Sequence, residues 1–210
     1  MSLVEAQDLS FGFGSRTLVS GLSFTLNAQE LLLVSGPNGV GKSSLLQVIL
    51  GFAPAKISAG KLNLAVASNE IAWIPQMENP EFHLPLTLRD VLDISVPGRL
   101  DESAVLELGL LRREHLRHSW NQASGGERKR TLITRALLHH PRLLLLDEPL
   151  NHLDLESRAI VTQGLSRYLA SGKGAAIVDS HDAFSGQELS LFKRHELLIE
   201  SGRHALESHL

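Results

Sequence analysis

The stretch from residue 36 to residue 44 constrains the fold of this chain more than any other. It reads Gly-Pro-Asn-Gly-Val-Gly-Lys-Ser-Ser and fits the pattern G-x-x-x-x-G-K-S/T. Glycines in such a loop let backbone N–H groups turn inward and form a concavity that binds anions. Lys42 would reach the outer phosphates of a nucleotide, and the Ser43 hydroxyl would bind Mg²⁺. The stretch therefore predicts a binding site for a nucleoside triphosphate.

The residues on either side predict a strand before this loop and a helix after it. Residues 31–34 form a continuous apolar run, which is typical of a strand buried on both faces. Residues 45–50 are mostly apolar and predict a buried helix, with Gly51 suited to its end. The N-terminus of that helix would face the phosphates and add its dipole. The alternative is a glycine-rich turn that merely precedes a lysine, and such a turn would need neither a strand before it nor a helix after it.

The composition limits the class of protein. The chain has 210 residues, of which 43% are hydrophobic and 20% charged, as in a soluble globular domain with room for a small subdomain. Its formal net charge of −3 gives no electrostatic reason to expect nucleic acid as a partner, and without cysteine there is no disulfide or thiolate metal site. No apolar run approaches the roughly 18 residues that span a bilayer, so another chain would supply any membrane part.

Polar side chains follow three further apolar runs. These runs are residues 71–74, 143–146 and 175–178, and the side chains that follow them are Gln76, Asp147 with Glu148, and His181. Ligand sites of open α/β sheets lie at the carboxyl ends of strands, so we expect these groups near the phosphates, although a lone glutamine or histidine is more often a surface residue. Asp147 would hold Mg²⁺ directly or through its waters, and Glu148 would orient or deprotonate water.

The segment before the loop predicts antiparallel strands. Leu22, Phe24 and Leu26 alternate with polar residues, as in a strand with one buried face. Residues 11–15 predict a turn between strands. Within it Phe13 lies between two glycines and could stack on a purine ring, and a core phenylalanine is the simpler alternative.

Three ranges after the phosphate loop predict the connections. Residues 53–60 predict a connection and residues 61–67 an edge strand. Residues 77–122 contain three prolines and two helical patterns, at residues 87–94 and 102–110, and they predict a helical subdomain inserted into the core.

The second half of the chain begins with a capping box. Ser124 precedes Glu127 by three residues, so a helix should begin here, and the two glycines between them leave backbone amides free for a second anion contact. Residues 151–154 predict the start of a helix that runs to about residue 169, and the Ser201-Gly202 pair predicts a hairpin between residues 196–199 and 203–206.

Taken in order, these features resemble the nucleotide-binding subunit of ATP-binding-cassette (ABC) transporters over nearly the whole chain. The matching motifs are Walker A at 36–44, the Q-loop at Gln76, the signature at 124–127, Walker B at 143–148, the D-loop at 151–154 and the switch histidine at His181. Phe13 lies where this family places an aromatic ring against adenine. Three positions depart from the family pattern: Gln29, Ala123 and Glu127 stand where glycine, leucine and glutamine are usual.

The resemblance implies an α/β fold of the P-loop NTPase type, with a mostly parallel sheet flanked by helices. The expected parts are an antiparallel β subdomain at residues 1–30, a nucleotide-binding core at 31–76 and 123–210, and the helical subdomain at 77–122.

The resemblance also implies a working ATPase with ATP and Mg²⁺ as cofactors. It implies nucleotide contacts from Phe13, Gly36, Pro37, Asn38, Gly39, Val40, Gly41, Lys42, Ser43 and Ser44, and across a dimer interface from Ser124, Gly125, Gly126, Glu127 and Asp154. Ser43, Gln76 and Asp147 would serve the metal, and Glu148, His181, Gln76 and Lys42 would carry the chemistry. The dimer would be head-to-tail, with an identical copy or with a second, different cassette.

The resemblance leaves the transported substrate open. Residues 84–92 resemble importers of metal ions, iron chelates and cobalamin, with a separate permease docking on 77–122 at the cytoplasmic face of the cell membrane. The D-loop sequence also occurs in soluble ABC proteins that act on ribosomes or DNA, and a small exporter cassette for haem or lipid is a further alternative.

Overall fold

The structure of the chain is a computed structural model. It describes residues 2–52, 54–76, 85–94, 100–180, 192–200 and 203–209. His181, the Ser201-Gly202 pair and part of the 77–122 range lie outside the described residues.

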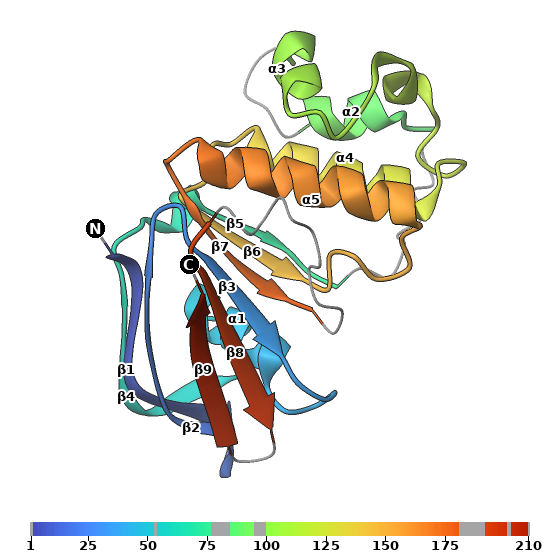
Figure 1. Cartoon of the computed structure of the whole chain (residues 1–210). Coiled ribbons are helices and arrows are strands. Elements are labelled where there is room, and N and C mark those ends of the chain that lie inside the picture. Colours follow the sequence, from blue (N-terminus) through green and yellow to red (C-terminus); the bar gives the residue numbers. More distant parts are fainter. Residues whose placement is uncertain are drawn as a thin grey trace.

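A six-stranded sheet forms the centre of the molecule (Figure 1). Its strands are β3 (Leu31–Ser35), β5 (Ile71–Ile74), β6 (Leu143–Asp147), β7 (Ala175–Asp179), β8 (Arg194–Glu200) and β9 (Arg203–His209). Their order is β5-β6-β7-β3-β8-β9, and every neighbouring pair is parallel except β8 and β9, which form the expected antiparallel pair. Because the middle strands are covered on both faces, their sequences are apolar throughout rather than alternating. The mostly parallel sheet that the family resemblance implies is confirmed.

A second, antiparallel sheet contains the N-terminal strands. It consists of β1 (Ser2–Phe13), β2 (Arg16–Asn27) and β4 (Lys56–Leu64) in the order β2-β1-β4. The edge strand expected at residues 61–67 exists but begins earlier, at Lys56, so the connection predicted at 53–60 is partly wrong. The strand was hard to recognise because its first six residues are all exposed and show no apolar periodicity. The turn predicted at 11–15 is also narrower, because β1 continues to Phe13.

The helices form layers on the two faces of the larger sheet (Figure 1). Helix α1 (Lys42–Leu50) lies between the sheets, and α4 (Gly125–Leu137) and α5 (Leu155–Ala170) cover the opposite face. Successive strand residues point to opposite faces, so neighbours in one strand belong to different cores. Leu143 and Leu145 pack in the core around α1, whereas Leu144 and Leu146 pack beneath α4 and α5. The positions of the loops at the strand ends are fixed by both cores.

The described part of 77–122 contains two helices, α2 (Leu88–Asp93) and α3 (Glu102–Glu107), and a short 3-10 turn at Arg113–Arg117. Another 3-10 turn, Ser68–Glu70, precedes β5. Figure 1 shows α2 and α3 beyond α4, away from the large sheet. Thr87 caps α2 with Asp90, and Asp101 caps α3. Both predicted helices are confirmed, although α3 ends three residues earlier than expected.

The helix expected to open at residues 151–154 begins later, at Leu155. Asp154 is its N-cap residue and accepts a hydrogen bond from the Ser157 amide at 2.7 Å. His152 has a φ of 61°, which is outside the helical region. The D-loop residues therefore form a turn that leads into the helix.

Candidate functional site

The glycine-rich loop joins β3 to α1 and leaves the start of that helix open. Gly36 has a φ of 138°, and a Cβ there would lie 2.0 Å from the Ile199 carbonyl oxygen, so a side chain cannot be accommodated. Gly41 is the N-cap of α1 and provides no capping side chain, and the first turn contains no acidic residue. The amides at this helix end therefore face a site without local competition, as an anion-binding loop requires.

Lys42 is folded back over the loop. Its side chain is 5% exposed, its Nζ donates to the Pro37 carbonyl oxygen at 3.2 Å, and it lies 3.9 Å from Asp179 Oδ1. A bound phosphate would offer this ammonium group a stronger, charge-assisted partner than a carbonyl oxygen. The structure thus places the predicted phosphate-binding lysine at the loop.

The strand ends bring together most of the other predicted groups. The Ser43 hydroxyl donates to Asp147 Oδ1 at 3.2 Å, and Gln76 Nε2 donates to Glu148 Oε2 at 2.9 Å. Asn151 donates to the same Glu148 oxygen. Glu148 has a φ of 47°, an uncommon conformation for a residue with a side chain, and its amide donates to the Asp179 carbonyl oxygen at 3.0 Å. Its carboxylate is thereby held between β5 and the turn after β6.

Asp179 belongs to this group and was missed by sequence reasoning. It is the last residue of β7, and its Oδ2, 3.3 Å from the Ser43 hydroxyl, shares that hydroxyl's proton with Asp147. Burial raises the pKa of Asp179 to about 7, against the effect of Lys42, and burial also raises the pKa of Asp147. The signal was present in the sequence, because Asp179 ends an apolar run just as Asp147 does; the strand was expected to stop one residue earlier.

Lys129 of α4 is a second cation near these acids. Burial lowers the pKa of the Lys129 ammonium group, and the charges of Asp147 and Glu148 act in the opposite direction. The sequence gave no indication that Lys129 lies near these acids. Lys129 comes soon after the signature motif in the sequence, whereas Asp147 and Glu148 stand at the end of β6 and directly after it.

A cavity of about 510 Å³ opens beside the loop. It is lined by Phe13, Leu18, Asn38, Gly39, Gly41, Lys42, Ser43, Ser44, Gln76, Glu148 and Asn151. Phe13 is 37% exposed, whereas Phe11 is fully buried in β1. The Phe13 ring is therefore accessible to a ligand, as expected. The cavity therefore has an apolar end at the tip of the β1–β2 hairpin and a polar end at the strand termini.

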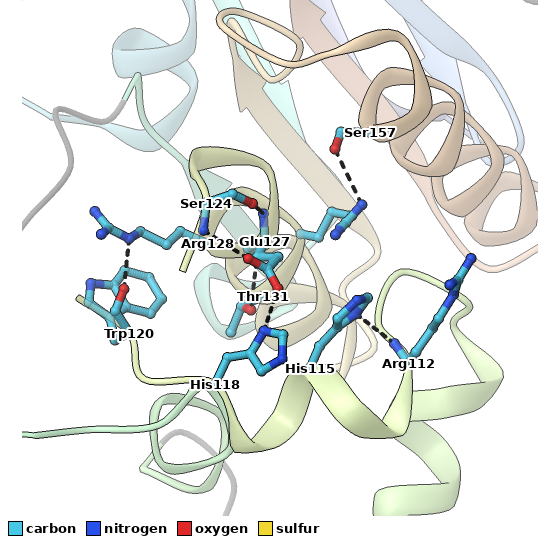
Figure 2. A network of polar contacts seen from close by, with 10 residues as sticks. Arg112, His115, His118, Trp120, Ser124, Glu127, Arg128, Thr131 and Ser157 are labelled. Atoms are coloured by element: carbon cyan, nitrogen blue, oxygen red, sulfur yellow. Dashed lines mark hydrogen bonds and ion pairs between the residues drawn. The ribbon is translucent and has the colours of Figure 1, made fainter. Parts of the chain in front are cut away.

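The signature residues lie in a different cavity of the same chain. Ser124, Glu127 and Asp154 line a space of about 320 Å³ together with Arg130 and Ser157, and none of the five lines the cavity beside the loop. Figure 2 shows Ser124 and Glu127 at the start of α4. Ser124 accepts from the Glu127 amide at 3.1 Å while Glu127 Oε2 accepts from the Ser124 amide at 2.8 Å, which confirms the predicted capping box.

Glu127 also contacts His118, as Figure 2 shows, with Nδ1 lying 2.6 Å from Oε1. Although burial works in the opposite direction, hydrogen bonds from Ser124 and His118 leave the pKa of Glu127 lowered. The carboxylate that replaces the usual glutamine is thus engaged within its own chain, at the end of the helix that carries the signature.

Ser43, which lines the loop cavity, and its hydrogen-bond partner Asp147 fit a divalent cation that is shared with a ligand. Two oxygen-bearing groups, the Ser43 hydroxyl and the Asp147 carboxylate, are already 3.2 Å apart, and Mg²⁺ prefers such ligands together with phosphate and water oxygens. Among the residues that the structure describes, no cluster of three or more His, Cys, Asp and Glu side chains forms a metal site. The nucleotide itself would have to complete the coordination.

The strand-loop-helix phosphate site, the acids at neighbouring strand ends and the sheet order together define a P-loop nucleoside triphosphatase. The chain belongs to the ABC transporter family, whose model matches residues 19–151. It binds ATP and is an ATPase that couples hydrolysis to transport. The resemblance drawn from the motifs is confirmed.

Two curated relatives match most of the chain. The zinc import ATP-binding protein ZnuC of Acinetobacter baylyi is 35% identical over 183 residues, which cover 86% of this chain and 68% of the relative. The protein of the same name from Vibrio cholerae is 36% identical over the same shares of both chains.

Solved structures show the same fold. An ABC transporter described as of metal-chelate type, in an inward-facing conformation, superposes with a TM-score of 0.79 at 22% identity, covering 99% of this chain and 83% of the other. An ATP-binding cassette of an ABC transporter in its ADP conformation gives a TM-score of 0.78 at 20% identity and covers 98% and 90% of the two chains. In the described part of this chain, no helix combines the length and the apolar character needed to cross a membrane.

Proposed function

We propose that this chain powers the uptake of a metal ion or metal chelate by a separate membrane permease, with zinc as the first ion to test. The observation that carries this proposal is the 35–36% identity to two zinc import ATP-binding proteins across 86% of the chain. The permease would hold the chain at the cytoplasmic face of the cell membrane. With a net charge of −3, we expect no nucleic acid among its partners.

The site residues would divide the work on ATP between them. The amides of 36–44 and Lys42 would hold the phosphates, and Phe13 would stack on the adenine ring. Ser43, Asp147 and Gln76 would hold Mg²⁺ or its waters, and Mg²⁺ when bound would neutralise phosphate charge.

Hydrolysis itself needs a positioned water. Glu148 is held by Gln76 and Asn151 at the polar end of the cavity, where its carboxylate would accept a proton from water in line with the outer phosphate. His181 would contact that phosphate.

We further propose that two cassettes close head-to-tail over the nucleotides. Ser124 and Gly125 are exposed and lie away from the loop cavity, so they can reach a phosphate only in another chain. Leu155, directly after the D-loop, is 86% exposed, and an apolar side chain so placed favours burial against a partner. The second cassette would be a copy of this chain or a related one.

The permease would dock on the helical region beside β5. A mainly apolar cavity of about 440 Å³ lies there, between the core and the helices. It is lined by Asn69, Ile71, Ala72, Trp73, Ile74, Pro75, Val91, Trp120, Leu132, Arg135, Ala136 and His139. Because one wall belongs to β5 and the other to α2 and α4, a helix seated there would sense movement between the two parts.

Reversing the charge of Arg135 tests this docking. Arg135 is exposed on α4 at the edge of the cavity, so Arg135→Glu should remove co-purification with the permease and leave ATP hydrolysis by the isolated subunit within about twofold. Arg203→Glu, an exposed change on β9, serves as the matched control. Retention of the permease by Arg135→Glu would place the docking surface elsewhere.

Zinc uptake by cells tests the proposed function as a whole. Cells that lack this gene should take up radioactive zinc more slowly at low external zinc, and the unchanged chain should restore uptake. Glu148→Gln should not restore it, since uptake needs hydrolysis. Normal zinc uptake in cells without the gene would contradict the proposal, and a defect in protein synthesis or in export would favour the other members of the family considered above.

A further inference from the structure

Asp179 is a buried acid that the roles assigned above do not use. Its residue is 0% exposed, and its Oδ1 has no hydrogen-bond donor, only the ion-pair distance of 3.9 Å to Lys42 Nζ. A buried carboxylate without full compensation is costly, so its presence here calls for a compensating cation or ligand.

The position of Asp179 in the sheet mirrors that of Asp147. The two residues are direct partners in the parallel register of β6 and β7, so both carboxylates leave the same edge of the sheet on adjacent strands. The Ser43 hydroxyl lies between them, 3.2 Å from Asp147 Oδ1 and 3.3 Å from Asp179 Oδ2. One hydroxyl proton cannot satisfy both acceptors fully.

The surrounding charges leave an excess of negative groups. Asp147, Glu148 and Asp179 interact with one another, whereas Lys42 lies beside Asp179 and Lys129 is the cation near Asp147 and Glu148. When a nucleotide binds, its phosphates bring further negative charge and compete for Lys42. A divalent cation beside Ser43 would then be the group that offsets both carboxylates.

We propose that Asp179 is a second carboxylate of the metal–nucleotide site, which makes nucleotide binding by this chain unusually dependent on the divalent cation. This inference rests on the proposed binding of Mg²⁺ with the nucleotide. Asp179 acts through water on the cation or directly on it, and in the absence of the cation it repels the phosphates and retains Lys42.

The test measures how strongly Mg²⁺ and ADP favour each other's binding. Isothermal titration calorimetry gives the dissociation constant of ADP in excess MgCl₂ and in EDTA, for the unchanged chain and for Asp179→Asn. ADP avoids hydrolysis. We expect the tightening of ADP by Mg²⁺ to fall about tenfold in the variant, a size usual for coupling between two ligands. ADP binding in EDTA should become tighter, because a facing negative charge is gone.

Controls separate this role from a structural one. The control variant is Asp8→Asn, which changes an exposed acid of β1. Asparagine tolerates the φ of 47° at this position, and the variant should leave the Mg²⁺ effect unchanged. Thermal unfolding without nucleotide checks that Asp179→Asn is folded, and Asp179→Ser gives a second variant.

Two outcomes would overturn the inference. An unchanged Mg²⁺ effect in both Asp179 variants would do so, as would an equal loss of ADP affinity with and without Mg²⁺, which would indicate a structural role. If instead the unchanged chain bound ADP equally well in MgCl₂ and EDTA, the proposed metal site itself would fail.

Discussion

Glu148→Gln should lower the rate of ATP hydrolysis by at least about a hundredfold, the size of effect expected on losing a general base, while ATP binding is retained. Glutamine keeps the shape of the side chain and can still contact Gln76 and Asn151, the two residues whose amides donate to Glu148. What it loses is the ability to accept a proton from water. Phosphate release under saturating ATP measures the rate, and calorimetry measures the affinity.

The matched control for this prediction is Glu207→Gln on β9. Glu207 is exposed and is not among the residues that line the loop cavity. Its hydrolysis rate should equal that of the unchanged chain. Hydrolysis by Glu148→Gln within a factor of a few of that rate would assign water activation to another group.

Lys42→Ala should weaken ATP binding by about a hundredfold, because truncating one partner of a buried charge contact typically costs 2–5 kcal/mol. Lys42 is only 5% exposed and lies at the loop, where no other residue of 36–44 is charged. Lys61→Ala, on exposed β4, should bind ATP normally. ATP affinity within twofold of normal in Lys42→Ala would contradict the phosphate assignment.

The same Lys42→Ala variant has a pH signature in its stability. The pKa of Asp179 is raised to about 7 in the folded chain, and Lys42 is the group that keeps it from rising further. An acid whose pKa is higher in the folded state than in the unfolded state lowers the free energy of unfolding as pH rises through the folded pKa. Without Lys42 the folded pKa of Asp179 should be higher still, and this further loss of stability appears only above about pH 7. The free energy of unfolding, measured with denaturant, should therefore differ more from that of the unchanged chain at pH 9 than at pH 6.

Local patterns made much of the fold predictable. The phosphate loop, the apolar runs that became β3, β6 and β7, and the capping box at Ser124 each depend on neighbouring residues in the sequence. Such features appear in the sequence because the backbone geometry is decided within a few residues.

Other features depended on tertiary contacts and were not predictable in this way. β4 is largely exposed, and it exists because β1 offers it an edge to pair with, not because of its own pattern. Lys129 reaches the acids at the end of β6 only through the packing of α4 on the sheet. Asp179 could have been recognised at the end of its apolar run, but its pairing in register with Asp147 is a tertiary contact.

The family resemblance implied that Ser124 contacts a phosphate across a dimer interface. In the structure Ser124 lines another cavity than the one beside the loop of the same chain. We therefore propose a site assembled from two chains.

Changing Ser124 in the Glu148→Gln background tests that claim most directly. Ser124→Asp and Ser124→Asn both retain a good helix cap, but only the aspartate brings a negative charge toward the partner's phosphates. By analytical ultracentrifugation with ATP, we predict a dimer for Glu148→Gln alone and with Ser124→Asn, and a monomer with ATP still bound for Ser124→Asp. A dimer for Ser124→Asp, or loss of ATP from its monomer, would contradict the account.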